Sequence, residues 1–277
     1  MRVAVVGHLE WVQFARVERV PEAGEIVHAL ESWEEPGGGG AVAAVALARL
    51  AGEATFFCAL GDDELARRSH AELERRGVRV RAAQRSAPQR RVFTFLDAAG
   101  ERTITVLGPR MGPLGADPLP WEELAQADAV YFCAGDVAAL RAARAARVLV
   151  ASPRPREVLR EASVALDALV HSVRDVHEQL EPDELEPRPR WLVSTDGVRG
   201  GRYRAAGGAG GSYAAASPPG ALVDCYGCGD SFAAGLTYAL GAGSSIEAAL
   251  ELGARCGAEC VTGRGPYGAP LTPPDPE

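Results

Sequence analysis

The chain has 277 residues, of which 47% are hydrophobic, and a formal net charge of −8 at pH 7. An α/β domain of this length need not be divided, so one domain over residues 1–277 is expected. The chain has no basic stripe interleaved with aromatic residues, which argues against a nucleic-acid partner. It also has no apolar run of about 20 residues and no secretory leader, so we expect no membrane span and a cytoplasmic location.

Lysine is absent, and all 29 basic residues are arginine. This excludes a phosphate loop that depends on lysine and a Schiff base to pyridoxal phosphate. Any phosphate clamp must therefore use arginine, backbone N–H groups or a metal.

Short apolar segments alternate with helical patterns along the chain. Most of the apolar segments lack alternating polar residues, as is typical of strands covered on both faces. The alternation predicts a doubly wound α/β domain, a three-layer α/β/α sandwich with a mainly parallel central sheet. Strands are expected at 2–7, 54–60, 129–134, 147–151, 168–172 and 190–195, and helices at 41–51, 63–76, 137–146, 228–240 and 245–260.

One region departs from this alternation. Residues 91–97 and 102–106 flank the turn at 98–100 and predict a β-hairpin. With extended segments near 11–18 and 25–33, the hairpin is expected to form a small sheet of its own. The alternative is an antiparallel edge of the main sheet.

Two later segments are expected to lack regular structure. The glycine cluster at 207–211 predicts a turn or loop, since it lacks the flanking strand and helix of a dinucleotide fingerprint. The tail Pro270–Glu277 contains four prolines and is expected to be poorly ordered.

The segment from Asp224 to Phe232 carries the strongest functional signal. Its Gly-Cys-Gly turn (Gly227, Cys228, Gly229) leads into the last but one predicted helix. The free N–H groups and dipole of a helix N-terminus favour a bound anion, and the Asp230 carboxylate would lie beside it. An anion hole next to a general base is what phosphoryl transfer to an alcohol requires. A simple helix cap and tight turn would give the same residues.

The cysteines suggest a different function. The pairs Cys225/Cys228 and Cys256/Cys260 have spacings compatible with a zinc or thiol-redox site. Neither pair lies in a zinc-ribbon context. Small apolar residues in a reducing compartment explain them as well.

The 224–232 segment resembles the second signature of the ribokinase-like carbohydrate kinases, the PfkB family. Cys225 and Cys228 stand where the family carries Thr and Ala. The resemblance extends over nearly the whole chain, through motifs in the family's order. The matching residues are Asp224, Gly227, Gly229, Asp230, Phe232 and Gly235, then Pro21 with Gly24-Glu25, the run Gly37–Ala41, Gly61-Asp62-Asp63, and Thr195, Gly197 and Gly200.

The resemblance implies an ATP-dependent phosphotransferase that acts on a hydroxymethyl group of a sugar or sugar-like acceptor, with Asp230 as base and Mg²⁺ on the phosphates. It implies a sugar-covering lid from about 11–33 and 90–107, and a homodimer through that lid. Thr195, Gly197, Gly200 and Gly265 would contact the nucleotide. The family's metal-linked Asn-X-X-Glu motif is reduced to Ser172-X-X-Asp175, and Asp224 with the Tyr226 carbonyl would hold a monovalent cation such as K⁺.

The acceptor side departs from the family pattern. Val12 and Val42 stand where the family has an aspartate and an asparagine that bind sugar hydroxyls. Glu10, His8 and the backbone of Gly37, Gly38 and Gly39 remain as polar candidates. Two missing hydroxyl partners predict an acceptor other than ribose, with a less polar part, such as a nucleoside or deoxysugar. A nucleoside kinase, or a catalytically weak ligand-binding or regulatory protein on the same fold, are therefore the alternatives.

Overall fold

The computed structural model describes residues 1–180 and 184–271, so most of the proline-rich tail lies outside the described residues. Within them, a nine-stranded sheet has the order β13-β12-β11-β10-β9-β8-β1-β4-β5. Neighbours from β11 to β5 run parallel, while β12 and β13 are antiparallel additions. The strands are β1 Val3–Val6, β4 Ala54–Leu60, β5 Val78–Gln84, β8 Ala129–Phe132, β9 Val148–Ala151, β10 Ala168–Ser172, β11 Trp191–Thr195, β12 Gly201–Ala205 and β13 Gly210–Tyr213.

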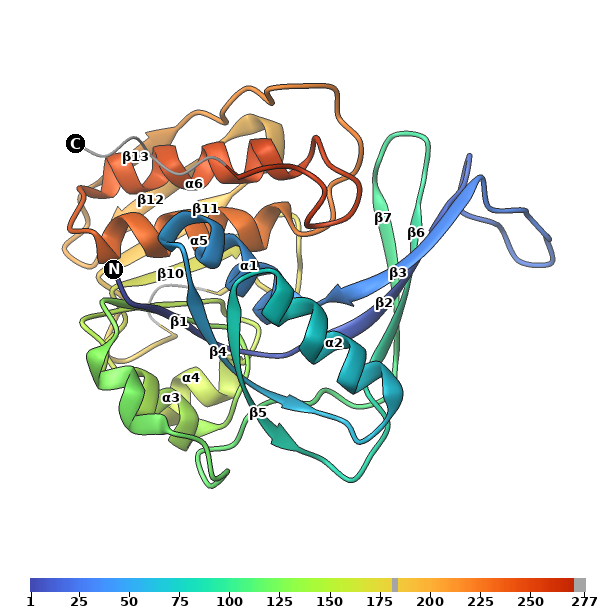
Figure 1. The fold of residues 1–277 in the computed structure, drawn as a ribbon. Helices are drawn as coiled ribbons and strands as arrows, with labels where there is room; N and C mark the ends of the chain where they lie inside the picture. Colours follow the sequence, from blue (N-terminus) through green and yellow to red (C-terminus); the bar gives the residue numbers. More distant parts are fainter. Residues whose placement is uncertain (181–183, 272–277) are drawn as a thin grey trace.

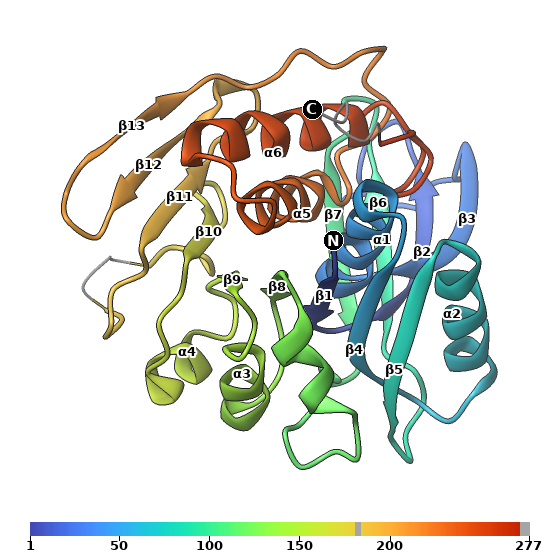
Figure 2. The same ribbon diagram turned by 60° about the vertical axis from the view of Figure 1, so that its left-hand side comes forward.

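Helices cover both faces of this sheet (Figures 1 and 2). Alternate residues of β1 enter different cores: Val3 and Val5 join one cluster, Ala4 and Val6 the other. The first cluster includes α1 Gly39–Ala51, α2 Glu64–Arg75, α5 Cys228–Gly241 and α6 Ile246–Cys260. The second includes the short helices α3 Val137–Ala143 and α4 Arg156–Ala162 and the 3₁₀ turn Trp121–Gln126. The predicted three-layer sandwich is confirmed.

Helices α5 and α6 pack closely because glycine allows it. A Cβ on Gly235 would lie 2.8 Å from the Cys256 sulfur, and one on Gly253 would lie 3.0 Å from the Phe232 carbonyl oxygen. The pair anchors the N-terminal turn of α5 against the sheet.

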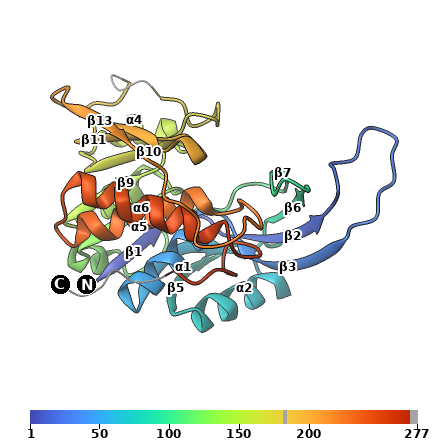
Figure 3. The same ribbon diagram turned by 90° about the horizontal axis from the view of Figure 1, so that it is seen from above.

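A second sheet of four strands, in the order β3-β2-β6-β7, stands apart from the first. It projects from one side of the molecule (Figure 3). Its strands are β2 Glu10–Arg16, β3 Glu31–Gly37, β6 Arg91–Leu96 and β7 Arg102–Leu107. The predicted hairpin is therefore part of a separate small sheet and not an edge of the main one. We call this sheet the lid.

Two local expectations need correction. The segment expected to be extended at 25–33 becomes a strand only from Glu31, where pairing with β2 begins. The glycine cluster at 207–211 is only partly a turn, because Gly210 and Gly211 pair with β12 as part of β13. No helix among residues 1–180 and 184–271 is long and apolar enough to cross a membrane.

The strand order identifies the edge of the sheet where ligands bind in such folds. From the centre, β1 leads to β4 on one side, and β8 lies on its other side. Parallel sheets bind ligands outside the carboxyl ends of strands at such a reversal of strand order. His8 follows β1, and Arg154 follows β9, so polar residues collect at this edge.

Candidate active site

Asp230 occupies the first turn of α5, the helix that starts at Cys228. Its carboxylate has a raised pKa of about 6, chiefly because burial disfavours the charged form, with a further rise from Glu178. The guanidinium groups of Arg154 and Arg102 oppose the rise. A carboxylate with a pKa close to neutrality suits a general base that must release its proton at physiological pH.

The turn before Asp230 presents backbone to solvent. Gly227 caps α5 in the left-handed region, with φ 84° and ψ −1°. A side chain would not fit at this position, because a Cβ on Gly227 would lie 2.9 Å from Pro266 and 3.0 Å from Val42. Gly229 is the opposite case: it is exposed, and a Cβ there would meet nothing within 4 Å. The backbone at Gly229 therefore borders free space that an anion can enter, whereas the Cys228 N–H donates to the Cys225 carbonyl at 3.5 Å.

The glycine run at the start of α1 lies directly against Asp230. A Cβ on Gly39 would lie 2.8 Å from Asp230 Oδ1, and one on Gly38 would lie 3.2 Å from Glu10 Cγ. Gly38 N–H donates to the Tyr226 hydroxyl at 3.1 Å. The structure thus brings together Asp230, Glu10 and the Gly37–Gly39 run, which the sequence analysis assigned to one site.

His8 and Glu10 form the floor beside this run. Both are buried, and His8 Nε2 lies 3.7 Å from Glu10 Oε1. Burial lowers the pKa of His8 to about 3, so the ring is neutral at physiological pH and the contact is not an ion pair. Burial raises the pKa of Glu10, and the nearby Arg90 guanidinium, whose Nε lies 3.1 Å from Glu10 Oε1, opposes that rise.

Val12 and Val42 both lie in the hydrophobic core, at 0% and 1% exposed. Each nevertheless adjoins a glycine of the site: Val12 Cγ2 would lie 2.7 Å from a Cβ on Gly37, and Val42 Cγ1 lies beside Gly227. They support the glycine backbone from behind. Their part in acceptor selection stays a prediction.

Asp175, the predicted remnant of the metal motif, pairs with Arg154. Glu178, which the sequence analysis did not single out, binds the same guanidinium at 2.8 Å and also accepts the Ser172 N–H at 2.9 Å. Glu178 is the carboxylate that acts most strongly on Asp230. It lies three residues past the motif position, where motif matching by spacing does not find it.

The Asp224 side chain is fully buried, and backbone N–H groups donate to its carboxylate. Its carboxylate accepts the Tyr226 N–H at 3.0 Å and the Gly265 N–H at 2.7 Å. These bonds fasten the loop around Gly265 to the turn before α5. They account for the burial of Asp224 without a cation, and they use the amide of Gly265, a residue that was assigned to the nucleotide.

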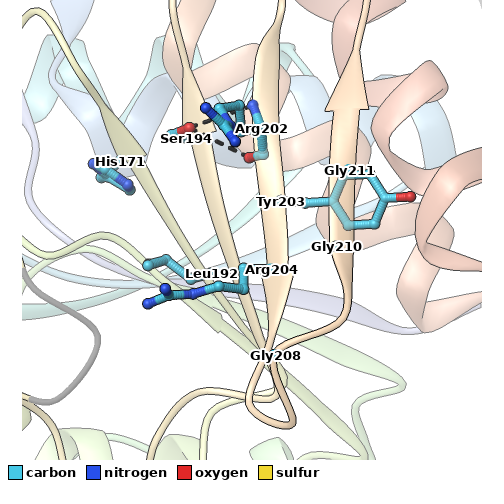
Figure 4. Close-up of a pocket in the computed structure, with 9 residues that line it drawn as sticks. All are labelled: His171, Leu192, Ser194, Arg202, Tyr203, Arg204, Gly208, Gly210 and Gly211. Atoms are coloured by element: carbon cyan, nitrogen blue, oxygen red, sulfur yellow. Dashed lines mark hydrogen bonds between the residues drawn. The ribbon is translucent and has the colours of Figure 1, made fainter.

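The remaining nucleotide candidates lie further along the same sheet edge. Thr195 ends β11 and its hydroxyl donates to the His171 carbonyl at 3.4 Å. Gly197 and Gly200 flank a 3₁₀ turn with φ 55° and 78°, which favours glycine at both positions. A pocket of about 420 Å³ opens nearby on β10–β13, lined by His171, Ser194, Arg202 and Arg204 among others (Figure 4). It includes none of the predicted site residues.

The six cysteines are free thiols. Burial raises the pKa of Cys228 to about 11 and also raises that of Cys225, which disfavours the reactive thiolate. The part of the chain that the structure describes has no group of three His, Cys, Asp or Glu side chains placed to hold a metal ion. The cysteine pairs therefore give the zinc or redox alternative no support.

Three arginines that act on His8 and Glu10 were missed by the sequence analysis. Arg90, Arg110 and Arg154 all lower the pKa of His8 and of Glu10, so their charges converge there. The chain has 29 arginines and no lysine, so composition gives no signal that separates these three from the rest.

Comparison with known proteins agrees with this geometry. The chain matches the model described as pfkB family carbohydrate kinase over residues 1–168 and 159–272. It is 32% identical over 292 residues to the ATP-dependent ribose-1-phosphate kinase of Halopiger xanaduensis, covering 98% of this chain and 95% of that protein.

Solved structures show the same fold. The ribokinase of Thermotoga maritima has a TM-score of 0.75 at 21% identity, covering 99% of this chain and 96% of its own. The Arabidopsis thaliana ribokinase, solved with ribose and ATP, has a TM-score of 0.73 at 21% identity, covering 98% and 95%. The sequence match spans the lid, the glycine run and the turn that carries Asp230. The chain therefore belongs to the pfkB family of carbohydrate kinases.

Proposed function

We propose that the protein transfers the γ-phosphoryl group of ATP to a hydroxymethyl group of a sugar, and that the sugar is a pentose 1-phosphate. The relative from Halopiger xanaduensis is named for ATP and ribose 1-phosphate, which supports both substrates. The observation that carries the reaction is Asp230, a carboxylate with a pKa raised to about 6 in the first turn of α5.

In this mechanism Asp230 takes the proton of the acceptor hydroxyl while the hydroxyl oxygen attacks the γ-phosphorus. The new O–P bond forms while the bond to the β–γ bridging oxygen breaks, which leaves ADP and a sugar with one more phosphate. The N–H groups of Gly227, Cys228 and Gly229 stabilise the negative charge that develops on the transferred group. Positioning and electrostatics, rather than a covalent intermediate, supply the rate.

Mg²⁺, when bound, neutralises charge on the phosphate oxygens. The carboxylates of Asp175 and Glu178 provide the hard oxygen ligands that this ion prefers, and both lie at Arg154. They fit a site that holds the ion directly or through water. A monovalent cation at Asp224 is a weaker expectation, because its carboxylate already accepts two backbone N–H groups, and no step of the mechanism depends on it.

The nucleotide would lie along the carboxyl edge from α5 toward β11. Thr195, Gly197 and Gly200 are the candidate contacts on that side, and Gly265 contributes through the loop that Asp224 holds. Because ATP is an intracellular phosphoryl donor, we propose a cytoplasmic reaction.

Two alternatives receive less support. A regulatory protein without activity would not need a carboxylate with a raised pKa next to free helix amides, and the family match favours a kinase. A nucleoside kinase follows from the apolar Val12 and Val42, yet both valines pack in the core and three arginine charges reach the same site. An acceptor with an anionic group fits that charge better.

The test is ADP release with ribose 1-phosphate, ribose, deoxyribose and adenosine as acceptors, measured for the native protein and for Asp230→Asn. We expect ribose 1-phosphate to be the best acceptor, and Asp230→Asn to lose about two to four orders of magnitude in kcat while ATP still binds. Glu247→Gln is the matched control, since Glu247 lies in the first turn of α6 and is exposed. Near-native turnover by Asp230→Asn would remove Asp230 from the mechanism.

A further inference from the structure

Arg90 is a buried cation with unused hydrogen-bond donors. It directly precedes β6 at the base of the lid, and its side chain is 7% exposed. Its ion-pair partner is Glu10, through Nε and Oε1 at 3.1 Å. Within residues 1–180 and 184–271, neither Nε nor Nη1 of Arg90 makes a hydrogen bond. A buried guanidinium whose N–H groups make no hydrogen bonds destabilises the folded protein, unless a ligand accepts those hydrogen bonds.

A second arginine, from another segment, acts on the same residues through its charge. Arg110 lies just beyond β7, where the chain returns from the lid to the body, and it is exposed. Its charge acts on His8, Glu10 and Arg90. No carboxylate lies within 4.0 Å of it in the described part of the chain. Arg154 differs, because Asp175 and Glu178 already match its charge.

The neutral ring of His8 has a nitrogen that also lacks a hydrogen-bond partner. His8 is 7% exposed, and its Nδ1 is another buried atom that lacks a hydrogen-bond partner among the described residues. Arg90, Arg110 and His8 thus come from three separate segments and leave donors or charge unmatched around Glu10. Unmatched donors and positive charge of this kind favour a bound anion.

We propose that Arg90 and Arg110 bind the phosphate that the acceptor sugar already carries, while its hydroxymethyl group points at Asp230; this rests on the proposed function. The planar guanidinium of Arg90 matches two phosphate oxygens, and the ion pair with Glu10 fixes its orientation. His8 supplies one more polar contact to the same group.

Contacts along the glycine run give the direction of the bound sugar. A Cβ on Gly39 would lie 2.8 Å from Asp230 Oδ1, and one on Gly38 would lie 3.2 Å from Glu10 Cγ. Glu10 pairs with Arg90 and packs by Gly38, so it lies between the two ends of the site. An acceptor must therefore span from the arginines, past Glu10, to Asp230. A sugar with a phosphate at one end and a hydroxymethyl group at the other meets this requirement.

The experiment measures calorimetric binding of ribose 1-phosphate, and separately of ATP, to the native protein and to Arg110→Met and Arg90→Met. Arg110 is exposed, so its variant should fold. Arg90→Met leaves Glu10 buried without its partner, so Arg90→Met with Glu10→Gln is made as well. The control is Arg67→Met, because Arg67 is exposed on α2 and pairs with its neighbour Glu64.

We expect each arginine variant to bind ribose 1-phosphate about 10- to 100-fold more weakly, the usual range for a lost charged hydrogen bond, and to bind ATP as the native protein does. The KM for ribose 1-phosphate should rise by a similar factor. Arg67→Met should match the native protein in every assay.

The outcomes separate the two proposals. Native binding and turnover of ribose 1-phosphate that persist in Arg110→Met and in the Arg90/Glu10 double variant would overturn the phosphate subsite and leave the proposed function standing. A native protein that ignores ribose 1-phosphate but phosphorylates an uncharged sugar would overturn both the acceptor class and the subsite. Weaker ATP binding in the arginine variants would assign these residues to the nucleotide instead.

Discussion

At the scale of single residues, the structure keeps one carboxylate in an unfavourable environment. Burial and Glu178 raise the pKa of Asp230 to about 6 from an ordinary value of 3.8. The folded protein therefore holds a proton that the unfolded chain has lost between about pH 4 and pH 6. Stability from this residue falls as pH rises through that window, and above it the folded state carries the full cost of the charge.

Replacing Asp230 by Asn should remove that cost. We expect the variant to be more stable than the native protein by about 2–3 kcal/mol at pH 7.5, and by roughly half as much at pH 5. Urea unfolding at the two pH values measures this. A variant less stable than the native protein at pH 7.5 would contradict the proposed cost of the buried Asp230 charge.

The residues of the site divide by how they could be recognised. Asp230, Glu10 and the Gly37–Gly39 run follow from motif spacing, because each lies at a fixed separation from a glycine turn or from the first strand. Arg90 and Glu178 do not, since their positions depend on how the lid base and the loop after β10 fold against the core. Long side chains reach a site from many places in the sequence, and only tertiary structure selects among them.

At the scale of elements, strongly patterned segments were predictable and weakly patterned ones were not. The inner strands and the four long helices appear within a few residues of their expected bounds. The sequence analysis missed β5, β12 and β13, which lie at or near the ends of the main sheet. In β12 and β13, arginine and glycine outnumber the apolar residues, so their strand conformation depends on pairing with a neighbour. In β5, valine alternates with arginine, a strand pattern that the sequence analysis did not use.

The role of the N-terminus of α5 can be tested at Gly229. Gly229→Ala should fold normally or gain stability, because alanine favours helix by about 1 kcal/mol and a Cβ there would meet no atom within 4 Å. The same Cβ would occupy space that the proposed mechanism gives to the transferred phosphoryl group. We expect turnover to fall at least about 10-fold, as for the loss of one good hydrogen bond to a charge.

Gly207→Ala is the matched control for this prediction, because its Cβ also meets nothing within 4 Å but lies in the turn between β12 and β13. Thermal melts and ADP release are measured for both variants. Full activity in Gly229→Ala would show that the phosphates do not approach that amide.

At the scale of the whole molecule, the lid ends in an open edge. All six residues of β7 are exposed, and β7 pairs with β6 alone among the described strands. Ile104 and Val106 are 43% and 45% exposed there. Open apolar edges promote association, which supports the homodimer through the lid that the family resemblance implies.

We expect the protein to be a dimer by light scattering, and Ile104→Lys with Val106→Lys to be a monomer, since two charges on the edge oppose pairing. Leu114→Lys is the control, because Leu114 is 44% exposed and lies outside the lid strands. A native monomer, or a dimer that the double change leaves intact, would rule out assembly through this edge.

The lid joins the body at residues that form the acceptor end of the proposed site. Glu10 starts β2, the Gly37–Gly39 run ends β3, Arg90 precedes β6 and Arg110 follows β7. Asp230, by contrast, stands on α5 in the body. Under the proposed function, phosphoryl transfer and acceptor choice depend on different stretches of the chain. Changes at these four junctions are expected to redirect the protein to a new acceptor while the phosphoryl-transfer residues stay intact, so the same scaffold can diversify where the lid joins the body.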